Sequence, residues 1–84
     1  MMNPTEAVTT HQRSIKIRRD YGERLRSLLQ DGYKVRHTYE GDDFLVTRLH
    51  HMCNGNDIIL KANLHDGVLF QHTNHILTYL CNYR

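Results

Sequence analysis

The sequence predicts a single α+β domain with an N-terminal helix, an antiparallel β-meander of three to four strands and a short C-terminal helix. Two observations predict this fold. Apolar residues recur at helical spacing from Tyr21 to Leu29, and after Gly32 the period of the pattern changes from 3.6 to 2, as in half-buried strands. The chain has 84 residues, with 39% hydrophobic and 24% charged content, which suits one globular domain. We expect this domain over residues 11–84, behind a flexible N-terminal tail over residues 1–10.

The predicted helix has a clear end and an ambiguous start. Gly32 follows the last periodic residue, where a left-handed C-terminal cap belongs. Ile17 continues the apolar stripe backwards, which favours a long helix. Against this, residues 20–23 form a good capping box, and Gly22 would cost about 1 kcal/mol inside a helix. We therefore favour a helix over residues 20–31 that follows an extended segment.

Alternating apolar residues predict strands over 33–39 and 58–64. Turn sequences set off two further strands, over 44–50 and 68–71, and the pattern of 44–50 does not fix which of its faces is buried. Thr73 is placed to cap a last short helix, although high β-propensity in residues 76–80 leaves a strand open there. The residues expected to be buried on the apolar sides of these elements are Leu25, Leu28, Val35, Leu60, Leu64 and Leu80.

Neither a membrane span nor a secretory leader is expected. No apolar run approaches the ~20 residues that cross a bilayer, and residues 1–10 lack the hydrophobic segment of a signal peptide. Two cysteines are too few for a typical disulfide scaffold. These features predict a cytoplasmic protein with reduced thiols.

Basic residues are concentrated near the N-terminus, although the net charge is only +2. Phosphate contacts need such clustered cations. The candidate binding residues are Arg13, Lys16, Arg19 and Arg26, joined by Lys34, Arg36 and Lys61 on an exposed sheet face. We therefore expect a small non-enzymatic, regulatory binding protein without a cofactor. A larger protein partner ranks slightly ahead of nucleic acid, and a homodimer is plausible because so small a sheet leaves edges to cover.

Histidines and cysteines in the second half of the chain allow a metal site as an alternative. His50-x-x-Cys53 and His72-x-x-His75 each place two possible ligands three residues apart. Two such pairs on tight turns are the usual arrangement around structural zinc. The alternative prediction is therefore a nucleic-acid-binding module stabilised by zinc or another divalent metal.

A second alternative uses some of the same residues. The order His50-His51, Asn63-Leu64 and then His72 or His75 resembles the HNH (His-Me finger) nuclease motif. This resemblance implies a metal-dependent nuclease in which His51 is the general base and Asn63 orients it, with His50 and His75 as metal ligands. The sequence departs from that family where residues 58–60 have the pattern of a strand instead of a polar loop. A small α+β ribonuclease is a further possibility, because it needs only one or two histidines and arginines, such as His37 beside Arg36.

Overall fold

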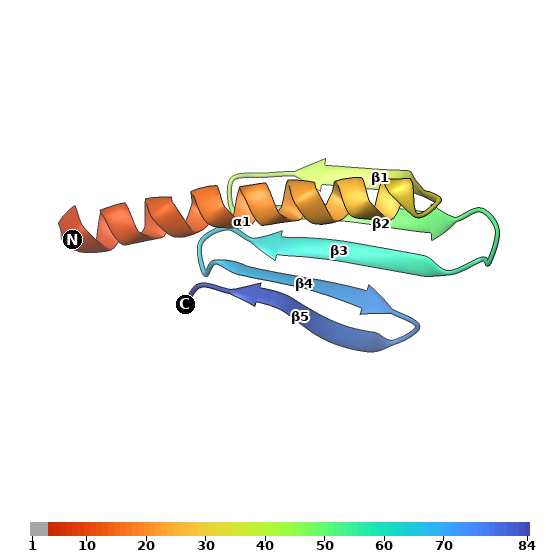
Figure 1. The fold of residues 1–84 in the computed structure, drawn as a ribbon. Coiled ribbons are helices and arrows are strands. Elements are labelled where there is room, and N and C mark those ends of the chain that lie inside the picture. Colours follow the sequence, from red (N-terminus) through yellow and green to blue (C-terminus); the bar gives the residue numbers. More distant parts are fainter. Residues whose placement is uncertain (1–3) are drawn as a thin grey trace.

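A computed structural model describes the backbone of residues 4–84 and the side chains of residues 10–84. One long helix is followed by a five-stranded antiparallel sheet whose strands lie side by side in chain order (Figure 1). The elements are α1 (Pro4–Gln30), β1 (Tyr33–Glu40), β2 (Phe44–His51), β3 (Asp57–Asn63), β4 (Val68–Thr73) and β5 (Ile76–Asn82). The α+β class and the N-terminal helix are confirmed, but the sheet has five strands where three to four were expected. Within the described residues, no helix is long and apolar enough to cross a membrane.

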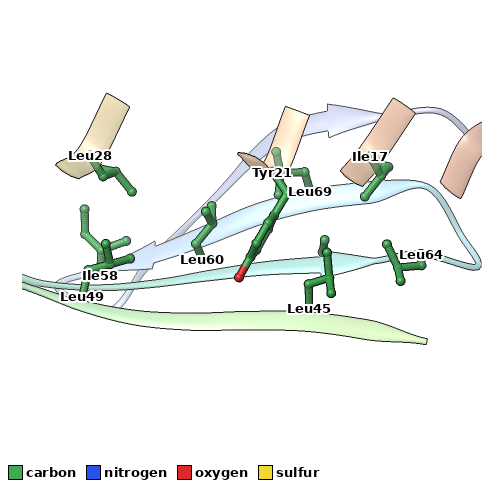
Figure 2. Packing of buried hydrophobic residues seen from close by; sticks show 10 residues of the cluster. Ile17, Tyr21, Leu28, Leu45, Leu49, Ile58, Leu60, Leu64 and Leu69 are labelled. Atoms are coloured by element: carbon green, nitrogen blue, oxygen red, sulfur yellow. The ribbon is translucent and has the colours of Figure 1, made fainter. Parts of the chain in front are cut away.

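The hydrophobic core lies between α1 and one face of the sheet (Figure 2). Ile17, Tyr21 and Leu28 point down from the helix, because positions four and seven residues apart share one side of it. The residues that meet them from the sheet side are Leu45, Leu49, Ile58, Leu60, Ala62, Leu64 and Leu69. Alternate residues of β2 and β3 are buried, as expected for a sheet with a single covered face.

One polar contact lies within this core. The hydroxyl of Tyr21 shares a hydrogen bond with the hydroxyl of Thr47, which is completely buried on β2. Figure 2 shows the Tyr21 ring reaching from the helix toward the sheet. A buried hydroxyl without a partner costs about 1–3 kcal/mol, so this pair fixes the position of α1 along β2.

A second polar cluster ties the end of the chain to the middle of α1. The Tyr83 hydroxyl donates a hydrogen bond to the Asp20 carboxylate, which also pairs with Arg19 at 3.3 Å. Burial acts to raise the pKa of Asp20, but hydrogen bonds from Tyr83, Cys81 and Arg19 outweigh it, so the pKa lies below its ordinary value. The ionised carboxylate is therefore the form that the fold stabilises.

The helix starts much earlier than expected. It runs without interruption from Pro4, so residues 4–10 are helical where a tail was expected, and residues 1–3 lie outside the described part of the chain. The prediction of an extended segment before Asp20 is wrong, because these residues are part of α1. Burial of Ile17 against the sheet outweighs the cost of Gly22 inside the helix, and Asp20 bonds to Tyr83 instead of capping a helix.

The expected C-terminal helix is wrong. β4 and β5 form a hairpin whose two turn residues, Asn74 and His75, have φ values of 50° and 67°. Two consecutive left-handed residues are typical of the turn that matches the twist of a two-residue hairpin. The β-propensity of residues 76–80 therefore prevails over a helix cap at Thr73.

The expected core is confirmed in part. Leu28, Leu60 and Leu64 are buried, and Leu25 and Leu80 pack partly buried against the cluster. The prediction that Val35 is buried is wrong, since its side chain is 44% exposed on the edge strand β1. Val35 pairs with the buried Leu49, which puts it on the helix side of the sheet, but β1 is the edge strand and its residues after Tyr33 are all exposed. A β-bulge lies between Val35 and His37.

Neighbouring residues of β3 provide a test of the sheet orientation. Leu60 is fully buried under α1, whereas Ile59 lies on the opposite face and is 37% exposed. We expect Leu60→Ala to lower the free energy of unfolding by about 2–4 kcal/mol, and Ile59→Ala by less than about 1 kcal/mol. Urea unfolding of both variants measures the difference. Equal losses would contradict the one-sided core.

The Tyr83–Asp20 hydrogen bond predicts a pH-dependent contribution to stability. The pKa of Asp20 is lowered by folding, so this contribution is complete above the unfolded-state pKa of about 3.9 and is lost as the pH falls through the folded-state pKa. Tyr83→Phe should therefore cost about 1 kcal/mol near neutral pH, and this cost should disappear in acid. Urea unfolding at a series of pH values measures it, with Tyr79→Phe on the exposed side of β5 as the matched control. A cost that is independent of pH would show that the bond does not act through the carboxylate.

Candidate functional site

The face of the sheet that points away from α1 carries rows of side chains that cross the strands. Paired residues of neighbouring antiparallel strands point to the same side, so the register defines these rows. One row is His37, Arg48, Ile59, His72 and Leu77; the next is Tyr39, Val46, Lys61, Phe70 and Tyr79; a shorter one is Lys34, His50 and Asp57. We call the surface formed by these three rows the open face, because in the described chain the one helix covers the opposite side (Figure 1).

Two aromatic rings on the open face are largely exposed. Tyr39 and Tyr79 are 56% and 61% exposed, and the ring of Phe70 lies 5.9 Å from that of Tyr79. The Lys61 ammonium lies 4.6 Å from the ring centroid of Phe44 and 5.9 Å from that of Phe70. A cation over a ring is attracted by its π-electrons. The centre of the open face therefore places a positive charge directly among aromatic surfaces.

The open face is also cationic. Lys34, Arg48 and Lys61 lie in its rows, whereas Asp57 is the one acid there and is engaged by His50. Arg36, at the β1 bulge, lines the same surface hollow as Arg48. Bases thus outnumber acids on a surface whose remaining side chains are histidine, aromatic or aliphatic.

A hollow of 660 Å³ lies at one end of the open face. It is lined by Arg36, His37, Arg48, Leu49, His50 and Asp57. The Nδ1 atom of His50 lies 2.9 Å from Oδ1 of Asp57, which stands opposite it at the start of β3. A carboxylate oxygen accepts hydrogen bonds, so Nδ1 of His50 carries the hydrogen, and in the neutral ring the lone pair is on Nε2.

His51, the neighbour of His50, has a structural role, because its ring bonds to the backbone of two other segments. Its Nδ1 accepts hydrogen bonds from the backbone N–H groups of Cys53 and Asn54, at 3.1 and 3.2 Å, so its Nε2 carries the hydrogen. Nε2 donates to the Asp31 carbonyl at 2.9 Å, and the ring packs edge-on against Tyr33. The ring therefore joins the β2–β3 turn to the end of α1.

The predicted binding residues fall into two separate groups. Lys34, Arg36 and Lys61 lie on or beside the open face, whereas the others lie on α1, on the far side of the sheet; these are Arg13, Lys16, Arg19 and Arg26. Several helix residues have partners within the domain: Arg19 pairs with Asp20, and the Lys16 ammonium lies 5.5 Å from the Tyr83 ring. The basic segment and the sheet residues therefore do not form one continuous surface.

The residues of the two metal-dependent alternatives are dispersed. Among the described residues, no three His, Cys, Asp or Glu side chains are grouped so that they could hold a metal ion. Cys53 is exposed in the β2–β3 turn, and His75 lies in the β4–β5 turn. His51 and Asn63 lie at opposite ends of the β2–β3 ladder, about 20 Å apart at the usual rise per residue. Asn63 is also bonded to Asp66, so this arrangement gives no support to an HNH-like site.

Several residues of the open face were missed by sequence reasoning. Arg48 was not among the predicted binding residues, yet it stands between His37 and Ile59 in its row and lines two hollows. Asp57 becomes the partner of His50 only through the β2–β3 hairpin. The alternation of Phe44, Val46 and Arg48 with buried residues of β2 was the available signal, but it needed a known inward side.

Comparisons of the chain with protein-family models, with curated proteins and with solved structures give no match.

Adjacent histidines of β2 provide a test of the two roles described above. His51→Ala should lower the free energy of unfolding by about 1–2 kcal/mol, because three backbone groups lose their partner. His50→Ala should change it by less than about 0.5 kcal/mol, since a solvent-exposed pair contributes little to stability. Urea unfolding at neutral pH compares them. Similar losses in the two variants would contradict the structural position of His51.

Proposed function

We propose that this protein binds single-stranded nucleic acid on the open face of its sheet, and that this binding needs no cofactor. The observation that carries the proposal is the row of Tyr39, Val46, Lys61, Phe70 and Tyr79. In this row aromatic rings and a cation stand side by side on a surface that no helix of residues 4–84 covers. Unpaired bases stack on such rings, and their phosphates need a nearby positive charge.

The chemistry of the face favours a nucleic acid over a protein partner. The centre of a protein interface is usually depleted of lysine, whereas Lys61 stands in the middle of this face. The excess of bases matches a polyanion. The flat arrangement of the rows suits bases that lie open on a surface, because each base has a ring face to offer whatever its identity. A regulatory role through binding, and the cytoplasmic location expected from the sequence, are compatible with this target.

A protein partner or a second copy of this chain is the competing occupant. Its support is the apolar edge of the sheet, where Ile76 and Leu77 of β5 are 65% and 42% exposed. Contact through this edge would depend on apolar area and would respond weakly to salt. Salt dependence therefore separates the two kinds of partner.

Binding is measured by fluorescence anisotropy with labelled single-stranded RNA and DNA of roughly 15 nucleotides. We expect the affinity of the parent protein to fall steeply as salt rises, because bound phosphates release counterions. Arg48→Ala with Lys61→Ala should lower the slope of log affinity against log salt by about 1–2. Tyr39→Ala with Tyr79→Ala should weaken binding at least about tenfold while retaining most of the salt slope.

The matched control removes two charges from the helix side of the domain. Arg19→Ala with Arg26→Ala deletes the same charge as the open-face pair, and we expect it to leave the affinity within about twofold of the parent. A large loss in this control, with normal binding by the Arg48 and Lys61 variant, would move the contact surface to α1. The absence of salt-dependent binding would contradict the proposed function, and a dimer seen by sedimentation would then favour the protein-partner alternative.

A further inference from the structure

The hollow at the end of the open face is lined by two arginines that could hold a phosphate, and also by two histidines and an aspartate. We propose that it is a site of RNA cleavage, in which His50 and His37 move protons and the neighbouring arginines hold the phosphate. This inference rests on the proposed function, because the substrate is a single strand of RNA lying across the open face. It goes beyond that function by assigning a reaction to the hollow.

His50 has the arrangement of a general base. Its Nδ1–H points to the Asp57 carboxylate at 2.9 Å, which leaves the lone pair of Nε2 available to accept a proton. A carboxylate on the far nitrogen fixes the tautomer and the ring orientation, and it stabilises the ring once a proton has been accepted. Asp57 is therefore a positioning residue, and the His50 side chain retains 25% of its exposure, so that a substrate can reach it.

The other groups of the hollow stand around the same space. His37 is paired with Arg48 across β1 and β2, and His50 is two residues further along β2 on the same face. Residues two apart on a strand are separated by about 7 Å, so a phosphate seated near Arg48 would lie between the two imidazoles. The β1 bulge occurs at Arg36, which lines the hollow beside His37 and supplies a second guanidinium. Two guanidiniums offer paired N–H donors to the phosphate oxygens.

These groups account for each proton of the reaction. His50 Nε2 accepts the proton of a ribose 2′-hydroxyl while its oxygen attacks the adjacent phosphorus. The bond from phosphorus to the 5′ oxygen breaks, and that oxygen takes a proton from protonated His37. The products are a 2′,3′-cyclic phosphate end and a 5′-hydroxyl end, and exchange with water restores both histidines. Arg48 and Arg36 stabilise the charge that develops on the phosphate oxygens.

The reaction requires the 2′-hydroxyl, so it distinguishes RNA from DNA. The assay uses two matched single-stranded oligonucleotides, one of DNA throughout and one of DNA with a single ribonucleotide, in the presence of a metal chelator. We expect cleavage only at the ribonucleotide, with a cyclic phosphate on the product, detected by mass spectrometry. His50→Gln and His37→Gln should each lower the cleavage rate at least about a hundredfold, while salt-dependent binding of RNA persists.

Asp57 is tested through kinetics, since it acts through His50. We expect Asp57→Asn to lower kcat at least about tenfold with KM nearly unchanged, and Asp57→Glu to restore part of the loss. His65→Gln, an exposed histidine of the β3–β4 turn, is the control purified in the same way and should cleave like the parent.

The outcomes separate the two proposals. RNA that binds with the expected salt dependence but is not cut would overturn the cleavage site and leave the binding function intact. Cleavage that persists in His50→Gln would also overturn it, because the activity would then come from other residues or from a contaminant. Failure to bind either oligonucleotide would remove the proposed function and this inference together.

Discussion

In residues 4–84 a single helix packs on a five-stranded sheet, and one helix covers only one face of it. The stripe of Ile17, Tyr21 and Leu28 is buried against β2, β3 and β4, and the hydrogen bond between Tyr21 and Thr47 sets where along the sheet the helix lies. The described part of the chain offers no second helix for the other face, so the residues there meet solvent or a partner. Because only one face of the sheet is covered, the core is one-sided, aromatic rings are exposed on the other face, and the strand edges are accessible.

The open face combines two properties that usually separate on a protein surface. Exposed aromatic rings favour removal from water, whereas lysine and arginine favour contact with it. Here the Lys61 ammonium lies close to two phenylalanine rings, so the cation and the aromatic surfaces attract each other directly. Such a surface remains tolerable in water and is still attractive to a ligand that is both flat and anionic.

Local sequence patterns predicted an element correctly where a single pattern was present. They failed where a contact with residues distant in the sequence determined the structure. The strands of the central sheet follow from alternation, and Gly32 ends the helix region with φ near 106°. The capping box at residues 20–23 was overridden because Ile17 gains a buried site that the local sequence does not reveal. Likewise Thr73 could cap a helix, but pairing of β5 with β4 satisfies backbone groups that a short helix would leave exposed.

The candidate site was less predictable than the fold, because it is made by strand pairing. His50 was noticed for its spacing to Cys53, yet its partner is Asp57, seven residues away across a hairpin. His37 and Arg36 were identified together, and the bulge between β1 and β2, which no spacing rule predicts, places both around the hollow with Arg48. The distribution of basic residues along the sequence pointed to the helix. The strand register instead brings the fewer basic residues of the sheet together on one surface.

The order of the elements has a consequence for how the domain is made. The helix is synthesised first, but the strands that bury its apolar stripe follow later, and Tyr83 at the end of the domain bonds to Asp20 in the middle of that helix. A growing chain would therefore carry Ile17 and Leu28 uncovered until β3 and β4 had left the ribosome. The core of this domain forms after translation of most of its length, and a chain truncated before β4 would expose the surface that chaperones and proteases recognise.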